Sequence, residues 1–267
     1  MELMFSPLFS GSSGNAVFVG EGEDRILVDA GVSCARIVKE LDQIGVKPET
    51  LKAILITHEH SDHTAGAGIL SRKFDLPIYA TEGTWGGMAD KVGAVHSKNI
   101  RIIDARQDFY IGKIGVCPFS IPHDASDPCG YSFCLGNLKA SIATDIGCIR
   151  EGWLNAVANS DILLLESNYD EDMLKAGKYP YALKKRILGR TGHLSNDDAG
   201  KAAVQLAARG CKNIILGHLS KENNFPELAE QTVRLALDEA GCVPGRDANL
   251  SIARRDGFSG LFSVKEA

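Results

Sequence analysis

The sequence predicts an α/β fold in which two sheets pack between outer helices. Short apolar β-like runs alternate with turn residues and helical patterns along the 267 residues. The continuous apolar run at residues 162–166 is typical of a strand buried on both faces, and a second section of alternating strand and helix patterns follows it. Periodicity alone leaves a single doubly wound sheet open as the alternative.

The first half of the chain is rich in predicted strands. β-like runs cover residues 16–19, 25–29 and 51–57. Ser33 begins a helix whose apolar residues recur at helical spacing, and Gly45 ends it. Later β-like runs cover residues 78–80, 100–103, 116–121, 131–135 and 139–144.

The last third of the chain predicts alternating helices and strands. Ser195 begins a helix that runs to about Arg209, and Asp198 three residues later completes a capping-box pattern. A strand at residues 213–216 and a helix at residues 226–240 follow. This order favours helices packed outside the predicted sheets.

Charge and apolar patterning exclude several classes of protein. The chain has 29 Lys and Arg against 34 Asp and Glu, a net charge of −5, which excludes a coat protein that binds nucleic acid through bulk charge. No apolar run predicts a membrane span, and residues 1–5 lack the pattern of a signal peptide. The seven scattered cysteines include no CxxC pair, which is typical of free thiols. We therefore expect a cytoplasmic protein with one domain, residues 1–267, and no membrane partner.

The strongest chemical signal directly follows the predicted strand at residues 51–57. His58, His60, Asp62 and His63 lie within six residues, and imidazole and carboxylate are ligands for zinc, manganese or iron. Side chains alternate in an extended turn, so His58 and His60 point to one side and can bind one ion. Asp62 and His63 lie further round the turn and can bind a second ion. The alternative is a surface loop that is rich in histidine by chance.

This HxHxDH string resembles the signature of the metallo-β-lactamase fold superfamily. Further positions of that signature recur in order, each at the end of a predicted strand: Asp29, His123, Asp145 and His218. The resemblance covers nearly the whole chain. It implies a four-layer αβ/βα sandwich with two divalent metal ions, zinc or manganese with iron as a further option.

The resemblance also implies a role for each position. The implied ligand sets are His58, His60 and His123 for one ion, and Asp62, His63 and His218 for the other, with Asp145 shared by both. Asp29 would orient the HxHxDH loop without touching a metal.

Three polar stretches bear on the substrate. Residues 10–15 combine glycines and hydroxyls, which let backbone N–H groups approach an anion. Residues 183–196 place four cations ahead of His193 and a helix start, where phosphate is favoured. Residues 218–224 add a cation and amides. The alternative for residues 10–15 is a plain β-turn, and the alternative for the basic run in residues 183–196 is a solvated helix face. The predicted substrate-binding residues are Ser13, Asn15, Lys221 and Asn223.

These stretches, with residues 81–85 and 165–170, resemble the YycJ (WalJ) group of the superfamily. The resemblance implies a cytoplasmic 5′-to-3′ DNA exonuclease that is linked to mismatch repair. The chemistry we predict is phosphodiester hydrolysis, in which a hydroxide shared by two metal ions attacks phosphorus in line. Asp62, Asp145 and His193 are the predicted catalytic residues, and His193 would contact phosphate or protonate the leaving oxygen.

Two other classes of function remain open. One is a small-molecule hydrolase of the same fold, such as a cyclic phosphodiesterase, lactonase or thioesterase. The other is a metal-binding regulator without catalysis, which the complete set of seven ligands argues against. Related nucleases such as ribonuclease J carry a large clamp domain between the bridging aspartate and the last histidine. Here 73 positions separate Asp145 from His218, and we expect one strand, a basic loop and one helix there, without a clamp.

Overall fold

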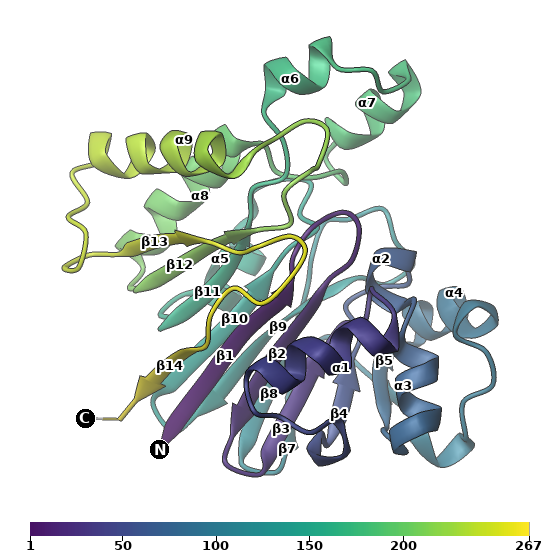
Figure 1. The fold of residues 1–267 in the computed structure, drawn as a ribbon. Coiled ribbons are helices and arrows are strands. Elements are labelled where there is room, and N and C mark those ends of the chain that lie inside the picture. Colours follow the sequence, from purple (N-terminus) through teal and green to yellow (C-terminus); the bar gives the residue numbers. More distant parts are fainter. Residues whose placement is uncertain (267) are drawn as a thin grey trace.

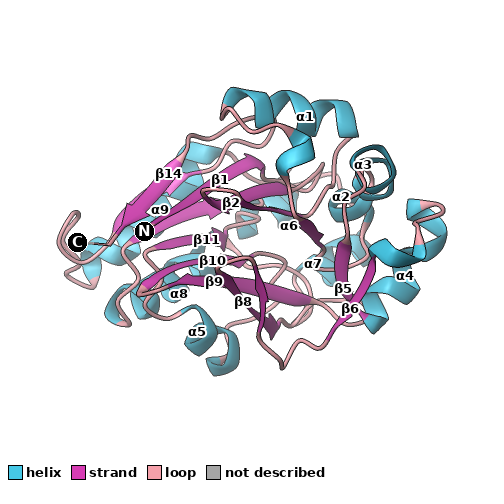
Figure 2. Ribbon diagram, turned by 90° about the horizontal axis from the view of Figure 1, so that it is seen from below, coloured by secondary structure: helices cyan, strands magenta, loops and turns pink. Residues whose placement is uncertain are grey.

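Two sheets packed face to face form the centre of the computed structural model, which describes residues 1–266 (Figures 1 and 2). Each sheet has seven strands within that part of the chain. The first has the spatial order β14 (Phe262–Lys265), β1 (Glu2–Phe9), β2 (Ala16–Glu21), β3 (Asp24–Val28), β4 (Ala53–Leu55), β5 (Ile78–Thr81) and β6 (Ile100–Ile103). The second has the order β13 (Asn249–Ile252), β12 (Asn213–Gly217), β11 (Ile162–Glu166), β10 (Leu138–Ala143), β9 (Cys129–Leu135), β8 (Ile114–Ser120) and β7 (Phe109–Ile111).

Helices cover the outer face of each sheet. The first sheet packs against α1 (Cys34–Gln43), α3 (Ala67–Phe74) and α4 (Glu82–Val92) in one apolar cluster. The second packs against α5 (Glu151–Val157), α8 (Asn196–Ala208) and α9 (Pro226–Glu239) in another. A third cluster fills the space between the sheets. The predicted four-layer αβ/βα sandwich is therefore confirmed.

Strand β11 shows why a continuous apolar run suits this position. Ile162 and Leu164 pack in the cluster between the sheets, whereas Leu163 and Leu165 pack against the outer helices. Both faces of the strand are buried, as the run predicts.

The parallel halves of the two sheets position the site. Strands β3, β4, β5 and β6 are parallel in the first sheet, as are β10, β11, β12 and β13 in the second. Ligands of α/β folds gather at the carboxyl ends of such strands. Asp29 directly follows β3, Asp145 comes shortly after β10, and His218 directly follows β12. The two edges are joined there by the Tyr131 hydroxyl, which donates to the Ile56 carbonyl oxygen at 2.9 Å.

Several helix boundaries agree with the sequence. Helix α1 begins after Ser33, and Gly45 beyond its end has a φ of 67°. Ser195 caps α8, where its side chain accepts a hydrogen bond from the Asp198 backbone N–H at 3.1 Å. Within residues 1–266, none of the helices has the length and apolar character needed to cross a membrane.

Other expectations were wrong. The strand predicted at residues 51–57 covers only Ala53–Leu55, because the chain turns into the HxHxDH loop and the short helix α2 (Ser61–Thr64). Between residues 145 and 218 the chain forms two strands, β11 and β12, rather than one, and it forms α5, α6 (Glu171–Ala176) and α7 (Tyr181–Ile187) in addition to α8. The stretch predicted as a basic loop thus begins inside α7. Helices of six or seven residues are too short to show a helical period in the sequence.

Candidate metal centre

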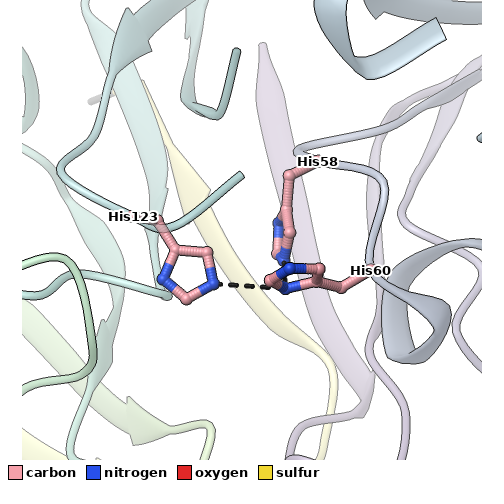
Figure 3. A group of neighbouring side chains, drawn as sticks. All are labelled: His58, His60 and His123. Atoms are coloured by element: carbon pink, nitrogen blue, oxygen red, sulfur yellow. Dashed lines mark hydrogen bonds between the residues drawn. The ribbon is translucent and has the colours of Figure 1, made fainter. Parts of the chain in front are cut away.

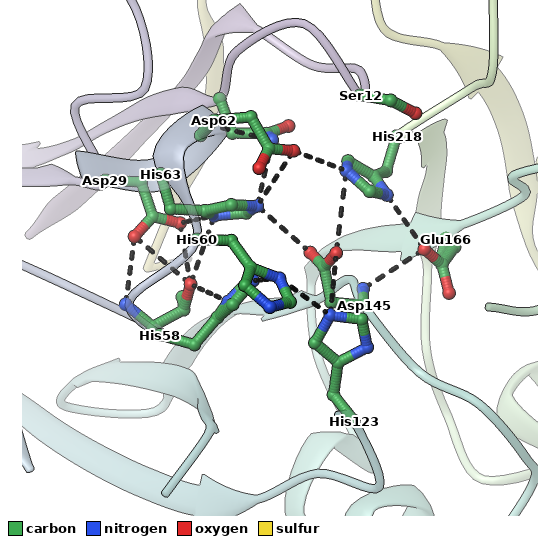
Figure 4. A network of polar contacts seen from close by, with 12 residues as sticks. Ser12, Asp29, His58, His60, Asp62, His63, His123, Asp145, Glu166 and His218 are labelled. Carbon is green, nitrogen blue, oxygen red and sulfur yellow. Dashed lines mark hydrogen bonds and ion pairs between the residues drawn. The ribbon is translucent and has the colours of Figure 1, made fainter. Parts of the chain in front are cut away.

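A cavity of about 550 Å³ opens at the carboxyl edge of the two sheets. His60, Asp62, Asp145 and His218 (Figure 4) line it, together with His193. Three residues that follow strands here have left-handed backbone conformations: Asp29, Asp145 and His218 have φ values of 59°, 58° and 55°. Such left-handed conformations are uncommon outside glycine and cluster at functional sites, where the surrounding structure holds them.

The first group of candidate ligands consists of His58, His60 and His123 (Figure 3). His60 Nδ1 lies 3.0 Å from His58 Nε2 and 3.3 Å from His123 Nε2. His123 Nδ1 lies 3.0 Å from the Gly192 carbonyl oxygen, and because a carbonyl can only accept, Nδ1 carries the proton. The unprotonated Nε2 of His123 is then the nitrogen that faces the other two rings, as a metal ligand requires.

The second group consists of Asp62, His63 and His218. The Asp62 carboxylate oxygen Oδ2 lies 3.6 Å from His63 Nε2 and 3.7 Å from His218 Nε2. Both imidazole rings are buried, whereas Asp62 faces the cavity. These three side chains come from two distant parts of the sequence, the HxHxDH loop and the residue after β12.

Asp145 lies between the two groups (Figure 4). Its Oδ1 is 3.7 Å from His123 Nε2 and 3.6 Å from His218 Nε2, and its Oδ2 is 3.4 Å from His63 Nε2. Within the described chain, Asp145 Oδ2 and His218 Nε2 are buried atoms without a hydrogen-bond partner. Such groups are costly unless something pairs with them, and a divalent cation at this point would do so. The donor set therefore fits a metal site.

Charge balance within the cluster keeps the carboxylates ionised. Burial alone would raise the pKa of Asp145, but the imidazoles of His218 and His63 outweigh burial and hold that pKa below its ordinary value. Burial likewise opposes protonation of His63, yet the carboxylates of Asp29, Asp145 and Asp62 raise its pKa to about 9. The excess of buried carboxylate thus attracts positive charge to this site, whether a proton or a metal cation.

Asp29 orients the HxHxDH loop. Its carboxylate accepts hydrogen bonds from the Thr57 backbone N–H at 2.9 Å and the Thr57 hydroxyl at 3.0 Å. It also lies 2.8 Å from His63 Nδ1, which leaves Nε2 of that ring to face Asp62 and Asp145. This is the arrangement by which a carboxylate fixes the orientation of a ligating histidine.

The variant Asp29→Asn tests this role. Asparagine has the same shape and tolerates the φ of 59° at this position, but it carries no charge to hold His63. We expect metal affinity to fall roughly 10- to 100-fold. Isothermal titration of the metal-free protein with zinc or manganese measures the change. An affinity equal to that of the wild type would contradict the role.

Glu166 is a functional residue that the sequence reasoning missed. It is fully buried, and its carboxylate accepts hydrogen bonds from His193 Nδ1 at 2.9 Å and His218 Nδ1 at 2.8 Å. It also accepts from the backbone N–H groups of Asp145, Ile146 and Leu194. The available signal was a lone acid that ends the apolar run of β11. A buried charge at that position needs several donors, and two of them prove to be site histidines.

The predicted substrate-binding residues lie around the cavity without lining it. Ser13 is exposed, and the neighbouring Ser12 lines the cavity instead. Asn15 is buried, with its side-chain nitrogen 3.0 Å from His63 Nε2. Lys221 points to solvent and Asn223 is buried, while Ser220 beside them lines the cavity. Side-chain direction in these irregular loops does not follow from sequence spacing.

Two cations line the cavity. Arg186 on α7 belongs to the predicted basic stretch, and its guanidinium NH2 group donates to Asp124 Oδ1 at 3.0 Å. Lys91 on α4 was not predicted, and its Nζ donates to the Glu59 carbonyl oxygen at 3.2 Å. Both side chains bring positive charge to the cavity wall.

Comparison with known proteins agrees with this geometry. Residues 24–218 match the family model described as the beta-lactamase superfamily domain. The chain is 39% identical to exodeoxyribonuclease YycJ of Bacillus anthracis over 241 residues, 90% of this chain and 91% of that one. It is 41% identical to exodeoxyribonuclease WalJ of Streptococcus pneumoniae serotype 2 over 245 residues, 91% of each chain. The chain therefore belongs to the beta-lactamase superfamily and, within it, to the family of YycJ and WalJ, which confirms the resemblance seen in the sequence.

Solved structures show the same fold at low identity. The metallo-beta-lactamase fold protein YhfI of Bacillus subtilis superposes with a TM-score of 0.75 at 16% identity, covering 99% of this chain and all of that one. Zn²⁺-bound PqqB of Methylobacterium extorquens superposes with a TM-score of 0.69 at 19% identity, covering all of both chains. At these identities the likeness concerns the fold alone.

Proposed function

We propose that this protein is a metal-dependent exonuclease that hydrolyses DNA from a 5′ end. The main support for the proposal is Asp145, whose carboxylate lies within 3.7 Å of ring nitrogens from both candidate ligand groups, beside an open cavity. The relatives named exodeoxyribonuclease, 39% and 41% identical over about nine-tenths of each chain, support the class of reaction. Action as one domain in the cytoplasm, without an inserted clamp, and a role in mismatch repair belong to the same proposal.

Two divalent cations, zinc or manganese with iron as the other option, would be held by the seven ligands named from the sequence. When bound, they would ionise a water for attack on phosphorus and neutralise the charge on the phosphate oxygens. Asp145 would contact both cations, and Asp62 would contact one at the cavity wall. Asp29 and Glu166 would keep the ligating nitrogens of His63 and His218 directed at the cations.

His193 would assist departure of the leaving oxygen. Its side chain is 17% exposed and lines the cavity, and Glu166 holds its Nδ1. Because an ionised carboxylate can only accept, Nδ1 carries a proton, and Nε2 is the nitrogen that can hold a second proton for the departing oxygen. Ser12, Ser220, Lys91 and Arg186 would bind the phosphates, in place of the exposed or buried residues predicted from the sequence.

The variant His193→Ala tests the role of that histidine. We expect kcat on DNA to fall about 100-fold or more, because protonation of a leaving group typically contributes that much. His96→Ala is the matched control, since His96 is the one histidine of the seven that lies outside the site. Metal content measured in both variants separates loss of proton transfer from loss of a cation. Equal kcat in both variants would contradict the role.

Incubation of metal-loaded protein with end-labelled DNA and RNA, single- and double-stranded, tests the function as a whole. Stepwise release from 5′ ends of DNA is the expected result. A generic ester, bis-p-nitrophenyl phosphate, is assayed beside the polymers. Turnover of that ester with every polymer left intact would contradict the nuclease and favour a small-molecule hydrolase. Inactivity on every substrate with zinc, manganese and iron would contradict hydrolysis altogether.

A further inference from the structure

The segment that contains α6 and α7 projects beyond the sheets at the edge where the cavity opens (Figure 1). Its apolar residues form a small cluster of their own, separate from the three clusters of the sandwich. That cluster contains Tyr169, Leu174 and Ile187, with Tyr179 and Leu183 packed against it. This segment therefore packs on its own apolar cluster and not on the core of the sandwich.

The inner face of the segment belongs to the wall of the cavity. Tyr179, Leu183, Arg186 and Ile187 line it together with the candidate metal ligands. Arg186 forms a two-pronged ion pair with Asp124, which directly follows the candidate ligand His123. This ion pair links α7 to the loop that carries the candidate ligand His123.

The segment also carries an exposed aromatic ring and exposed cations. Tyr181, the first residue of α7, is 82% exposed, although a tyrosine ring is a large apolar surface. Lys178, Lys185 and Arg190 are exposed, and within residues 1–266 none of them has a salt-bridge partner, unlike Lys175 and Arg186 of the same segment. Aromatic rings among cations are the surface on which single-stranded nucleic acid binds, through base stacking and phosphate contacts.

We propose that residues 178–190 form a platform for single-stranded DNA, on which Tyr181 stacks an unpaired base and Lys178, Lys185 and Arg190 contact the phosphates. This inference rests on the proposed nuclease function and names the form of its substrate. A duplex does not suit the platform, because its bases are already stacked on one another. DNA is the nucleic acid we infer because the relatives at about 40% identity are named exodeoxyribonucleases.

Binding of a fluorescent single-stranded DNA of about 16 nucleotides to the full-length, metal-free protein tests the platform by anisotropy. We expect Tyr181→Ala to raise Kd about fivefold or more, because one stacked base contributes that much. Tyr110→Ala is the matched control. Tyr110 is 76% exposed but lies on β7, next to the end of β8 that is remote from His123. The Kd of Tyr110→Ala for the single-stranded DNA should equal that of the wild type.

Salt dependence tests the cations. Lys185→Glu should reduce the slope of log Kd against log salt by about one phosphate contact, and Lys113→Glu, in the turn between β7 and β8, should leave it unchanged.

Four outcomes would overturn the platform. They are an unchanged Kd for Tyr181→Ala, an equal loss in Tyr110→Ala, equal salt slopes for the two lysine variants, and tighter binding of a duplex or of RNA of the same sequence. If wild-type protein degrades DNA while Tyr181→Ala binds it normally, the platform fails and the nuclease stands. If wild-type protein with every metal hydrolyses neither DNA nor bis-p-nitrophenyl phosphate, both fail.

Discussion

The variant Asp145→Asn is expected to lower turnover of DNA by more than about 10³-fold, because it removes the charge that both cations would share. Asparagine keeps the shape of the side chain and tolerates the φ of 58° at this position. Metal content should fall from two ions per chain to fewer than two. Steady-state kinetics and metal analysis of the same preparation provide the two measurements.

Asp161→Asn is the matched control for Asp145→Asn. Asp161 is also a buried aspartate of the second sheet, but it directly precedes β11, at the edge opposite the cavity, and pairs with Lys212 at 2.6 Å. The activity and metal content of Asp161→Asn should equal those of the wild type. Turnover by Asp145→Asn within a few-fold of the wild type would contradict the place of Asp145 between the cations.

The variant Glu166→Ala is expected to destabilise the metal-free protein by about 3–5 kcal/mol, because a buried, fully paired charge is lost and its donors remain. Five N–H groups would lose their acceptor, two from His193 and His218 and three from the backbone. Glu166→Gln keeps the volume and one acceptor oxygen, so a smaller loss is expected. Thermal unfolding should show Tm lower by roughly 10 °C for Glu166→Ala.

The control for this prediction is Glu21→Ala. Glu21 also ends a strand, β2, but at the opposite edge of the molecule, and among residues 1–266 it forms one ion pair, a 4.0 Å contact with the exposed Lys113. The free energy of unfolding of Glu21→Ala should fall by less than about 1 kcal/mol. Equal Tm values for Glu166→Ala and the wild type would show that the carboxylate does not organise the site.

The parts of the site that are local in sequence could be predicted from the residues. His58, His60, Asp62 and His63 lie within six positions, and the structure places each in at least one of four overlapping groups of candidate ligands. His123, Asp145 and His218 come from three other strand ends, so residue type alone could not choose them. The resemblance to a family supplied their order, and the sheets bring them together.

The contribution of Glu166 could not be predicted, because it depends on which donors surround its carboxylate. His193 and His218 approach it from the loops before α8 and after β12, which lie far from it in sequence. The left-handed backbone of Asp29, Asp145 and His218 could not be predicted either, because aspartate and histidine more often adopt ordinary conformations with negative φ.

Short elements account for most of the errors in the fold. Helices α6 and α7 have six and seven residues, and one or two turns show no clear period. No element was predicted at α6, and α7 overlaps the stretch predicted as a basic loop. Strand β1 was not predicted either. It contains Pro7, which lies where the register with β2 shifts. Proline lacks an N–H group to donate to a sheet, so it is found at such irregular positions.

We propose that seven side chains from both sheets hold a pair of cations beside the cavity. Elemental analysis of protein that has been stripped with a chelator, reconstituted with zinc or manganese and desalted tests it most directly. We expect two tightly held ions per chain in the wild type. One ion or none, in protein shown to be folded by its thermal transition, would contradict it.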